Sequence, residues 1–156
     1  MCSMRRIEEV TDAGEKMRIT REVLEALPEW FEVTESREQY IAESPSKIMV
    51  AAYEGDSVAG FLSLKETGRD TVELAVMGVL KEYHRNGFGR LLVEKAKEIA
   101  RHNGYSFMQV KTVKMGMYDD YDKTNLFYMG VGFKEFEVIP EIWDEANPCQ
   151  IYVMSL

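Results

Sequence analysis

The chain has 156 residues, of which 46% are hydrophobic and 29% are charged. This is the composition of one ordinary globular domain, and it excludes disordered, collagen-like and low-complexity classes. Nineteen Lys and Arg against 27 Asp and Glu give a net charge of −8. That balance argues against a protein that binds nucleic-acid phosphates or an anionic membrane surface, but it allows a local basic pocket for one anionic ligand.

Cysteine usage and the apolar runs narrow the class further. Cys2 and Cys149 stand at opposite ends of the chain without a Cys-x-x-Cys spacing, so we expect neither a disulfide scaffold nor a cysteine-based zinc site. The N-terminal residues lack the apolar stretch of a signal peptide, and no apolar run approaches the ~20 residues that span a bilayer. We therefore expect a soluble cytoplasmic protein without a metal.

The first part of the chain predicts one strand and two helices. We expect a strand at Arg5–Thr11 and a helix at about Thr20–Leu27, which Pro28 would end. The stretch Glu29–Lys47 favours a second, irregular helix under a polar surface.

Three apolar runs follow and predict three strands, at Ile48–Tyr53, Val58–Leu64 and Val72–Leu80. The Gly55-Asp56 dipeptide is a hairpin signal between the first two. The third run is long enough for a central strand that is buried on both faces. Gly78 near its end favours a bulge, because glycine weakens a strand interior.

The second half of the chain begins with the best-defined helix, over residues 88–101, where apolar residues recur at helical spacing and Asn103-Gly104 gives a stop. A strand, a short helix and two closing strands follow: Phe107–Val113, about Tyr121–Val131, Phe133–Ile139 and Gln150–Met154. The order βααβββαβαββ predicts a single α/β domain over residues 1–156, with a mixed central sheet and helices on both faces.

The segment between the third apolar run and the best-defined helix carries the clearest chemical signal. The loop and the first helical turn contain Gly87 and Gly89. The first N–H groups of a helix have no intrahelical partner, and the helix dipole adds partial positive charge there. Glycines let a phosphate approach those amides, and His84, Arg85 and Arg90 would add donors and charge. The segment therefore predicts an anion site.

Two other phosphate motifs fit this chain less well. The spacing from Gly55 to Gly60 is followed by Phe61-Leu62, whereas a Walker loop needs Lys and then Ser or Thr at those positions. A dinucleotide fingerprint would need a third glycine where Leu92 stands. From the residues alone, a merely structural pair of glycines and an ATP-binding loop both stay open.

Two motifs resemble those of the GNAT N-acetyltransferase superfamily. His84-Arg-Asn-Gly-Phe-Gly89 resembles its Q/R-x-x-G-x-G/A acetyl-CoA loop, with histidine where Gln or Arg is usual. Tyr128-Met-Gly-Val-Gly-Phe133 is similar to its Y-x-x-x-G-F signature. Order and spacing match from about Ile48 to the C-terminus.

The resemblance implies an enzyme that moves an acetyl group from acetyl-CoA to a primary amine by direct attack. The coenzyme pyrophosphate would bind the amides from Arg85 to Arg90, and a splayed strand end would pair with the pantetheine arm and the thioester oxygen. The residues that the resemblance assigns to the coenzyme are Met77, Gly78, Val79, Leu80, His84, Arg85, Asn86, Gly87, Phe88, Gly89, Arg90, Asn125 and Tyr128.

The resemblance also implies two catalytic residues. Tyr128 matches the family tyrosine whose hydroxyl reaches the coenzyme sulfur, where it would protonate the leaving thiolate; a merely packed aromatic is the alternative. Glu73 stands six residues before Val79, where some members carry the general base; a solvated strand-end carboxylate is the alternative. The acceptor is not readable, although the acidic run at Asp119 favours a small cationic amine. A non-catalytic acyl-CoA-binding or regulatory module on the same fold also stays open, as does a homodimer.

Overall fold

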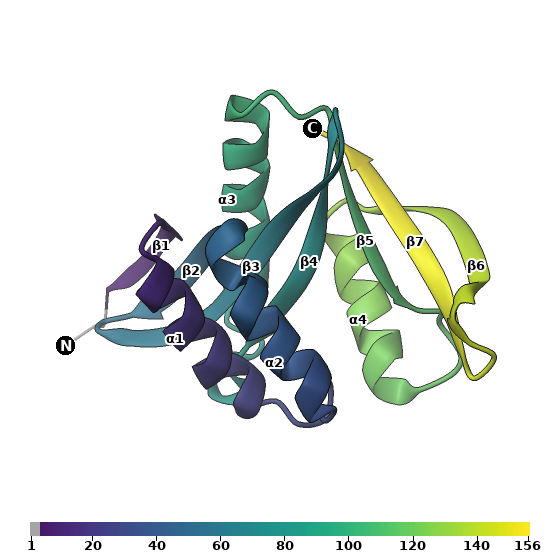
Figure 1. The fold of residues 1–156 in the computed structure, drawn as a ribbon, viewed down its shortest axis with the longest axis horizontal. Helices are drawn as coiled ribbons and strands as arrows, with labels where there is room; N and C mark the ends of the chain where they lie inside the picture. Colours follow the sequence, from purple (N-terminus) through teal and green to yellow (C-terminus); the bar gives the residue numbers. More distant parts are fainter. Residues whose placement is uncertain (1–3) are drawn as a thin grey trace. The chain divides into compact units, whose positions relative to one another are not determined.

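The computed structural model describes residues 4–156, and its elements follow the predicted order (Figure 1). The strands are β1 Arg5–Val10, β2 Ile48–Glu54, β3 Ser57–Gly68, β4 Thr71–Val79, β5 Phe107–Val113, β6 Lys134–Asp144 and β7 Asn147–Ser155. The α-helices are α1 Ala13–Glu25, α2 Thr34–Glu43, α3 Phe88–His102 and α4 Asp119–Gly130. Within this part of the chain, no helix is long and apolar enough to cross a membrane.

The sheet has the strand order β1-β2-β3-β4-β5-β7-β6. Strand β4 pairs parallel with β5, whereas β1 with β2, β2 with β3, β5 with β7 and β6 with β7 pair antiparallel. This confirms the predicted mixed α/β sheet. The chain divides into two compact units: residues up to Lys65 with Ala75–Ile99, and Glu66–Leu74 with Ala100–Leu156. Strands β3 and β4 each contribute residues to both units, and the single domain over residues 1–156 stays a prediction.

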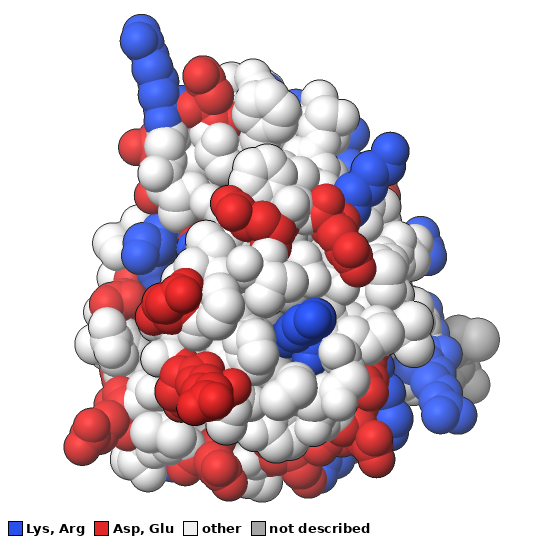
Figure 2. Space-filling view, turned by 90° about the vertical axis from the view of Figure 1, so that its right-hand side faces the viewer, with Lys and Arg blue, Asp and Glu red and all other residues white. Residues whose placement is uncertain are grey.

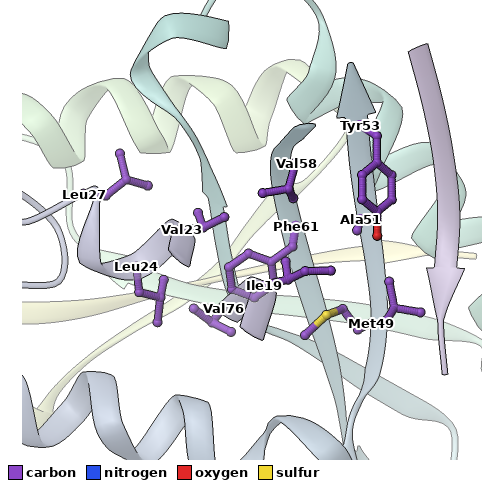
Figure 3. Close-up of a cluster of buried hydrophobic side chains, with 11 residues drawn as sticks. Ile19, Val23, Leu24, Leu27, Met49, Ala51, Tyr53, Val58, Phe61 and Val76 are labelled. Carbon is purple, nitrogen blue, oxygen red and sulfur yellow. The ribbon is translucent and has the colours of Figure 1, made fainter. Parts of the chain in front are cut away.

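The first unit buries apolar side chains on both faces of its strands. On one face, α1 packs against the strands through a cluster made up of Val10, Ile19, Val23, Leu24, Leu27, Met49, Ala51, Tyr53, Val58, Phe61 and Val76 (Figure 3). Val50 and Leu62 are paired across β2 and β3, alternate with this set and are also fully buried, so they point to the opposite face. Helix α3 covers that face with its buried residues, Phe88, Leu92, Val93 and Ala96 (Figure 1).

Helix α1 begins earlier than predicted. Its N-cap is Asp12, whose carboxylate accepts a hydrogen bond from the Glu15 N–H (2.9 Å). Such a cap satisfies one of the amides that the first turn leaves unbonded. The expected start at Thr20 was therefore wrong by seven residues, because the polar first turns of α1 hide its apolar face from the sequence pattern.

Strands β3 and β6 are longer than predicted. Strand β3 continues beyond Leu64 to Gly68 through four exposed residues, and β6 continues beyond Ile139 to Asp144. Asp144 accepts a hydrogen bond from the Asn147 amide (2.7 Å), which closes the turn into β7. The β3 extension accepts side-chain hydrogen bonds from Tyr105 at Glu66 (2.6 Å) and from Gln109 at Thr67 (2.8 Å). Both extensions are exposed, so an apolar pattern does not reveal them.

Candidate functional site

The loop between β4 and α3 has the backbone pattern of an anion-binding turn. Arg85 and Gly87 have left-handed backbones (φ +64° and +81°), and Asn86 between them does not. Such an alternation turns successive N–H groups toward one side, which is the geometry of an anion-binding nest. Helix α3 starts at once, and the Leu91 N–H bonds to the Gly87 carbonyl (3.1 Å). The first N–H groups of an α-helix have no carbonyl partner within the helix itself. We call residues 85–90 the amide nest.

The amide nest has room for a ligand. A Cβ at Gly87 would meet no heavy atom within 4 Å, and residues 84–87 are exposed. Arg85 holds a left-handed backbone without being glycine, which costs about 1 kcal/mol. Backbone strain of this kind gathers at ligand sites. The space, the left-handed loop and the positive end of α3 together suit a diphosphate.

The His84 side chain bonds to the end of β4 and does not reach out toward a ligand. Its Nε2 lies 2.7 Å from the Val79 carbonyl oxygen. Because a carbonyl only accepts, this nitrogen carries the hydrogen and donates it. The imidazole also packs edge-on against Trp30, with ring centroids 6.3 Å apart. We predicted that His84 donates to a phosphate, but Nε2 is committed to the end of β4, so only Nδ1 and the main chain could serve that role.

The end of β4 is shaped by close packing of α1. A Cβ at Gly78 would lie 2.8 Å from Val23 Cγ1 and 3.0 Å from Leu27 Cδ1. Gly78 therefore lets the helix and strand approach, and the expected bulge at this position stays a prediction. One residue past the strand, the Leu80 N–H donates to the Ala59 carbonyl of β3 (2.8 Å). This amide is not among the freed amides that we expected for the coenzyme arm.

In the second unit, Glu73 of β4 is paired with Lys111 of β5. The Lys111 Nζ lies 2.7 Å from Glu73 Oε1, and the two side chains are 26% and 16% exposed. Glu73 is thus a largely buried, ion-paired carboxylate and not a solvated strand end. Cys149 of β7 shares this face, because it pairs with Val113, two residues beyond Lys111. Burial raises the pKa of the Cys149 thiol; Lys111 opposes the rise and Glu73 adds to it.

Asn125 anchors α4 to the strands of the second unit. Its Nδ2 donates to the carbonyls of Val113 (2.9 Å) and Tyr121 (2.7 Å), and its Oδ1 accepts from the Tyr152 hydroxyl (2.6 Å). The side chain is fully buried. These bonds use both amide hydrogens, so the side chain that we expected to contact the coenzyme instead holds the helix in place.

Tyr128, one turn further along α4, lies in an aromatic cluster. Its ring is 5.6 Å from Phe133 and 6.2 Å from Tyr152, centroid to centroid, and the residue is 8% exposed. Tyr152 pairs with Val110 of β5. Since side chains alternate along a strand, Tyr152 and Lys111 point to opposite faces. Within this unit, Tyr128 and Glu73 therefore approach the strands from opposite sides.

The acidic run at the start of α4 has a structural use. Asp122 Oδ1 accepts a hydrogen bond from the Gly116 N–H (2.7 Å), which closes the preceding loop. Asp119 and Asp120 stand in the first turn of α4, where negative charge complements the helix dipole. Across residues 4–156, no group of three or more His, Cys, Asp or Glu side chains could hold a metal ion.

We did not predict a role for Lys111, the ion-pair partner of Glu73, from the sequence. A signal existed, because a lysine stands at an alternate position inside the apolar strand Phe107–Val113. A charged residue in such a run calls for a buried partner.

The strand order and the loop that follows β4 define a mixed α/β fold with a candidate anion site at the start of α3. The sequence model of the acetyltransferase (GNAT) family matches residues 17–119, about two thirds of the chain. The chain belongs to the GNAT acetyltransferase family.

Individual relatives agree with this assignment. An uncharacterized N-acetyltransferase from Chlorobaculum tepidum is 30% identical over 112 residues; the match covers 70% of this chain and 65% of the relative. The chain thus spans slightly less than two thirds of that relative's length. Among solved structures, a protein from Desulfovibrio desulfuricans that is assigned to the GNAT acetyltransferases has a TM-score of 0.79 at 20% identity, covering 97% of this chain and 99% of that one. An aminoglycoside 6'-N-acetyltransferase in complex with coenzyme A has a TM-score of 0.76 at 19% identity, with 96% of each chain covered. At these identities the two structures show the fold.

Proposed function

We propose that this protein transfers an acetyl group from acetyl-CoA to a primary amine by direct attack. The amide nest carries the proposal, because a left-handed loop that leads into a helix N-terminus is suited to the diphosphate of the coenzyme. Membership of the acetyltransferase family supports acyl transfer. The coenzyme A bound to an aminoglycoside acetyltransferase of the same fold supports the choice of coenzyme.

The chemistry needs one group that takes a proton and one that gives a proton. An alkylamine has a pKa of ~10.4, so its deprotonation at pH 7 costs about 4.6 kcal/mol. Because Glu73 and Tyr128 approach the strands from opposite sides, we assign proton removal to Glu73 through a water, while the C–N bond forms at the thioester carbon. The C–S bond then breaks, and Tyr128 protonates the departing thiolate, whose pKa is ~8.5. The products are the acetylated amine and the free thiol, and solvent restores both side chains.

Backbone amides complete the proposed site. Residues 85–90 would bind the diphosphate, and Met77, Gly78 and Val79 would pair with the pantetheine arm and the thioester oxygen. An N–H aimed at that oxygen stabilises the charge that develops during attack. Leu80 and Asn125 are left out of this set, because the Leu80 N–H bonds to Ala59 and the Asn125 side chain is buried in internal hydrogen bonds.

Coenzyme binding tests the amide nest without knowledge of the acceptor. Thermal shifts are compared for coenzyme A, acetyl-CoA and ATP with magnesium, in the wild type and in Gly87→Ala. Gly104→Ala is the matched control, because Gly104 is also left-handed (φ +89°) with no heavy atom within 4 Å of its would-be Cβ. Both variants incur about 1 kcal/mol of backbone strain.

We expect coenzyme A and acetyl-CoA to stabilise the wild type, ATP to do so less, and Gly87→Ala alone to lose most of the effect. A larger shift with ATP, or equal binding by the two glycine variants, would overturn the proposal.

Turnover separates an enzyme from a non-catalytic coenzyme binder. A panel of polyamines, aminoglycosides, amino acids and peptide N-termini is screened for release of free thiol from acetyl-CoA. We expect cationic amines to be preferred, because the chain carries a net charge of −8 and acidic side chains are spread over the face seen in Figure 2. Turnover only with neutral or anionic amines contradicts that preference, and binding without turnover favours the non-catalytic module.

A further inference from the structure

Arg5, at the start of β1, reaches the amide nest from a distant part of the sequence. Its Nη1 donates to the carbonyl oxygen of Asn86 (2.6 Å), a residue 81 positions later. Its guanidinium also lies over the ring of Phe88, with Cζ 4.7 Å from the ring centroid. Phe88 is buried and is the first residue of α3. Arg5 therefore contacts both the loop and the start of the helix.

The hydrogen bond to Asn86 fixes the direction of the next amide. In a planar trans peptide, the carbonyl of one residue and the N–H of the following residue point in opposite directions. Because Arg5 holds the Asn86 carbonyl toward itself, the Gly87 N–H is held toward the other side. Gly87 is one of the two left-handed residues that shape the nest, so its amide direction decides whether the row of donors converges.

The charge of Arg5 adds to this effect. A coenzyme with a diphosphate is strongly anionic, whereas the chain as a whole is acidic, so long-range electrostatics oppose its approach. A guanidinium bonded to the loop offsets that repulsion at the place of binding, and Arg5 is exposed.

We propose that Arg5 is a positioning residue for the coenzyme: it orients the Gly87 amide through the Asn86 carbonyl and supplies positive charge beside the diphosphate. This inference rests on the proposed function.

Arg6 provides a matched control. It neighbours Arg5 on the same strand and makes contacts of the same kinds away from the nest. Its Nε lies 3.2 Å from Glu8 Oε2, and its guanidinium lies 4.4 Å from the centroid of the Tyr53 ring. Removing either arginine takes away one exposed positive charge, the guanidinium N–H donors and one cation–π contact. Arg6 differs from Arg5 in its position relative to the amide nest and in its exposed ion pair with Glu8.

The experiment measures coenzyme A affinity by calorimetry for the wild type, Arg5→Met, Arg5→Lys and Arg6→Met. At about 0.05 M NaCl, we expect Arg5→Met to bind about tenfold more weakly, Arg5→Lys to recover most of that loss and Arg6→Met to stay within about twofold of wild type. At about 0.5 M NaCl, the gap between wild type and Arg5→Met should narrow, because salt screens the charge. The unfolding midpoints without ligand should be similar for Arg5→Met and Arg6→Met.

Two outcomes would overturn the role of Arg5. One is equal affinity of Arg5→Met and Arg6→Met for coenzyme A. The other is a loss in Arg5→Met that Arg5→Lys does not recover and that salt does not change, which would mark a purely structural contact. If the wild type itself does not bind coenzyme A, the proposed function fails instead, so the two failures are distinguishable.

Discussion

Gly78 is the position where enlarging one side chain gives the sharpest test of the packing between α1 and β4. The Cβ of Gly78→Ala would lie 2.8 Å from Val23 Cγ1 and 3.0 Å from Leu27 Cδ1, well inside the ~3.5–4.0 Å of an ordinary carbon contact. Both neighbours are buried, so α1 must shift or its side chains must leave their rotamers. Overpacking of this kind costs about 1–3 kcal/mol. For a chain of this length, we expect a fall of about 2–12 °C in the unfolding midpoint.

A double-mutant cycle with Val23→Ala identifies the cause of that cost. Val23→Ala alone removes two buried methyl groups and costs about 2 kcal/mol. In the double variant, the new methyl at position 78 takes up part of the vacated space. We therefore expect a total cost that is smaller than the sum of the two single costs by about 1 kcal/mol or more. Urea unfolding, followed by circular dichroism, gives all four free energies of unfolding.

The control cycle pairs Gly78→Ala with Ile19→Val. Ile19 lies in the same buried cluster, but it is not one of the three side chains nearest the added Cβ. We expect these two substitutions to be nearly additive. Additive costs in the Val23 cycle as well would show that α1 does not contact β4 at Gly78 in the way described.

Two further predictions concern the second unit. Tyr128→Phe should lower kcat by about 10²-fold or more while the Kd of coenzyme A stays within about threefold, because only the proton donor is lost; an unchanged kcat removes Tyr128 from the mechanism. Burial raises the pKa of the Cys149 thiol. The protonated thiol therefore contributes fully to the free energy of unfolding below its ordinary pKa of ~8.5, and this contribution is lost as the pH rises through the raised pKa. The free energy of unfolding should therefore fall less between about pH 8 and pH 10 in Cys149→Ala than in the wild type, and parallel curves would refute this.

The parts of the fold that the sequence predicted well are those with a strong local signal. Strand β5 has the predicted bounds, Phe107–Val113, because apolar Met108 and Val110 alternate with polar residues at the period of a strand. The hairpin at Gly55-Asp56 forms as expected, with Gly55 left-handed (φ +61°). The start of α1 was missed because its signal is a single polar cap, Asp12. The ends of β3 and β6 were missed because polar residues hold a strand by pairing as well as apolar ones do.

In the candidate site too, the features with a local sequence signal were predicted, and the contacts between residues far apart in the sequence were not. Gly87 and Gly89 pointed to the amide nest, and Gly87 is one of its two left-handed residues (φ +81°). The contacts of Arg5 with the nest and of Lys111 with Glu73 join residues 81 and 38 positions apart. No local pattern encodes such contacts, because they depend on which strands become neighbours. The internal hydrogen bonds of Asn125 are of the same kind.

At Arg85, an unfavourable backbone conformation is combined with a side chain that suits ligand binding. Glycine or asparagine would adopt its left-handed backbone (φ +64°) more readily than arginine does. The tight turn thus keeps a long cationic side chain at a point where a smaller neutral residue would make the unliganded fold more stable. Substitutions chosen only to raise the thermal stability of this protein would begin at Arg85. They would remove a positive charge from the amide nest.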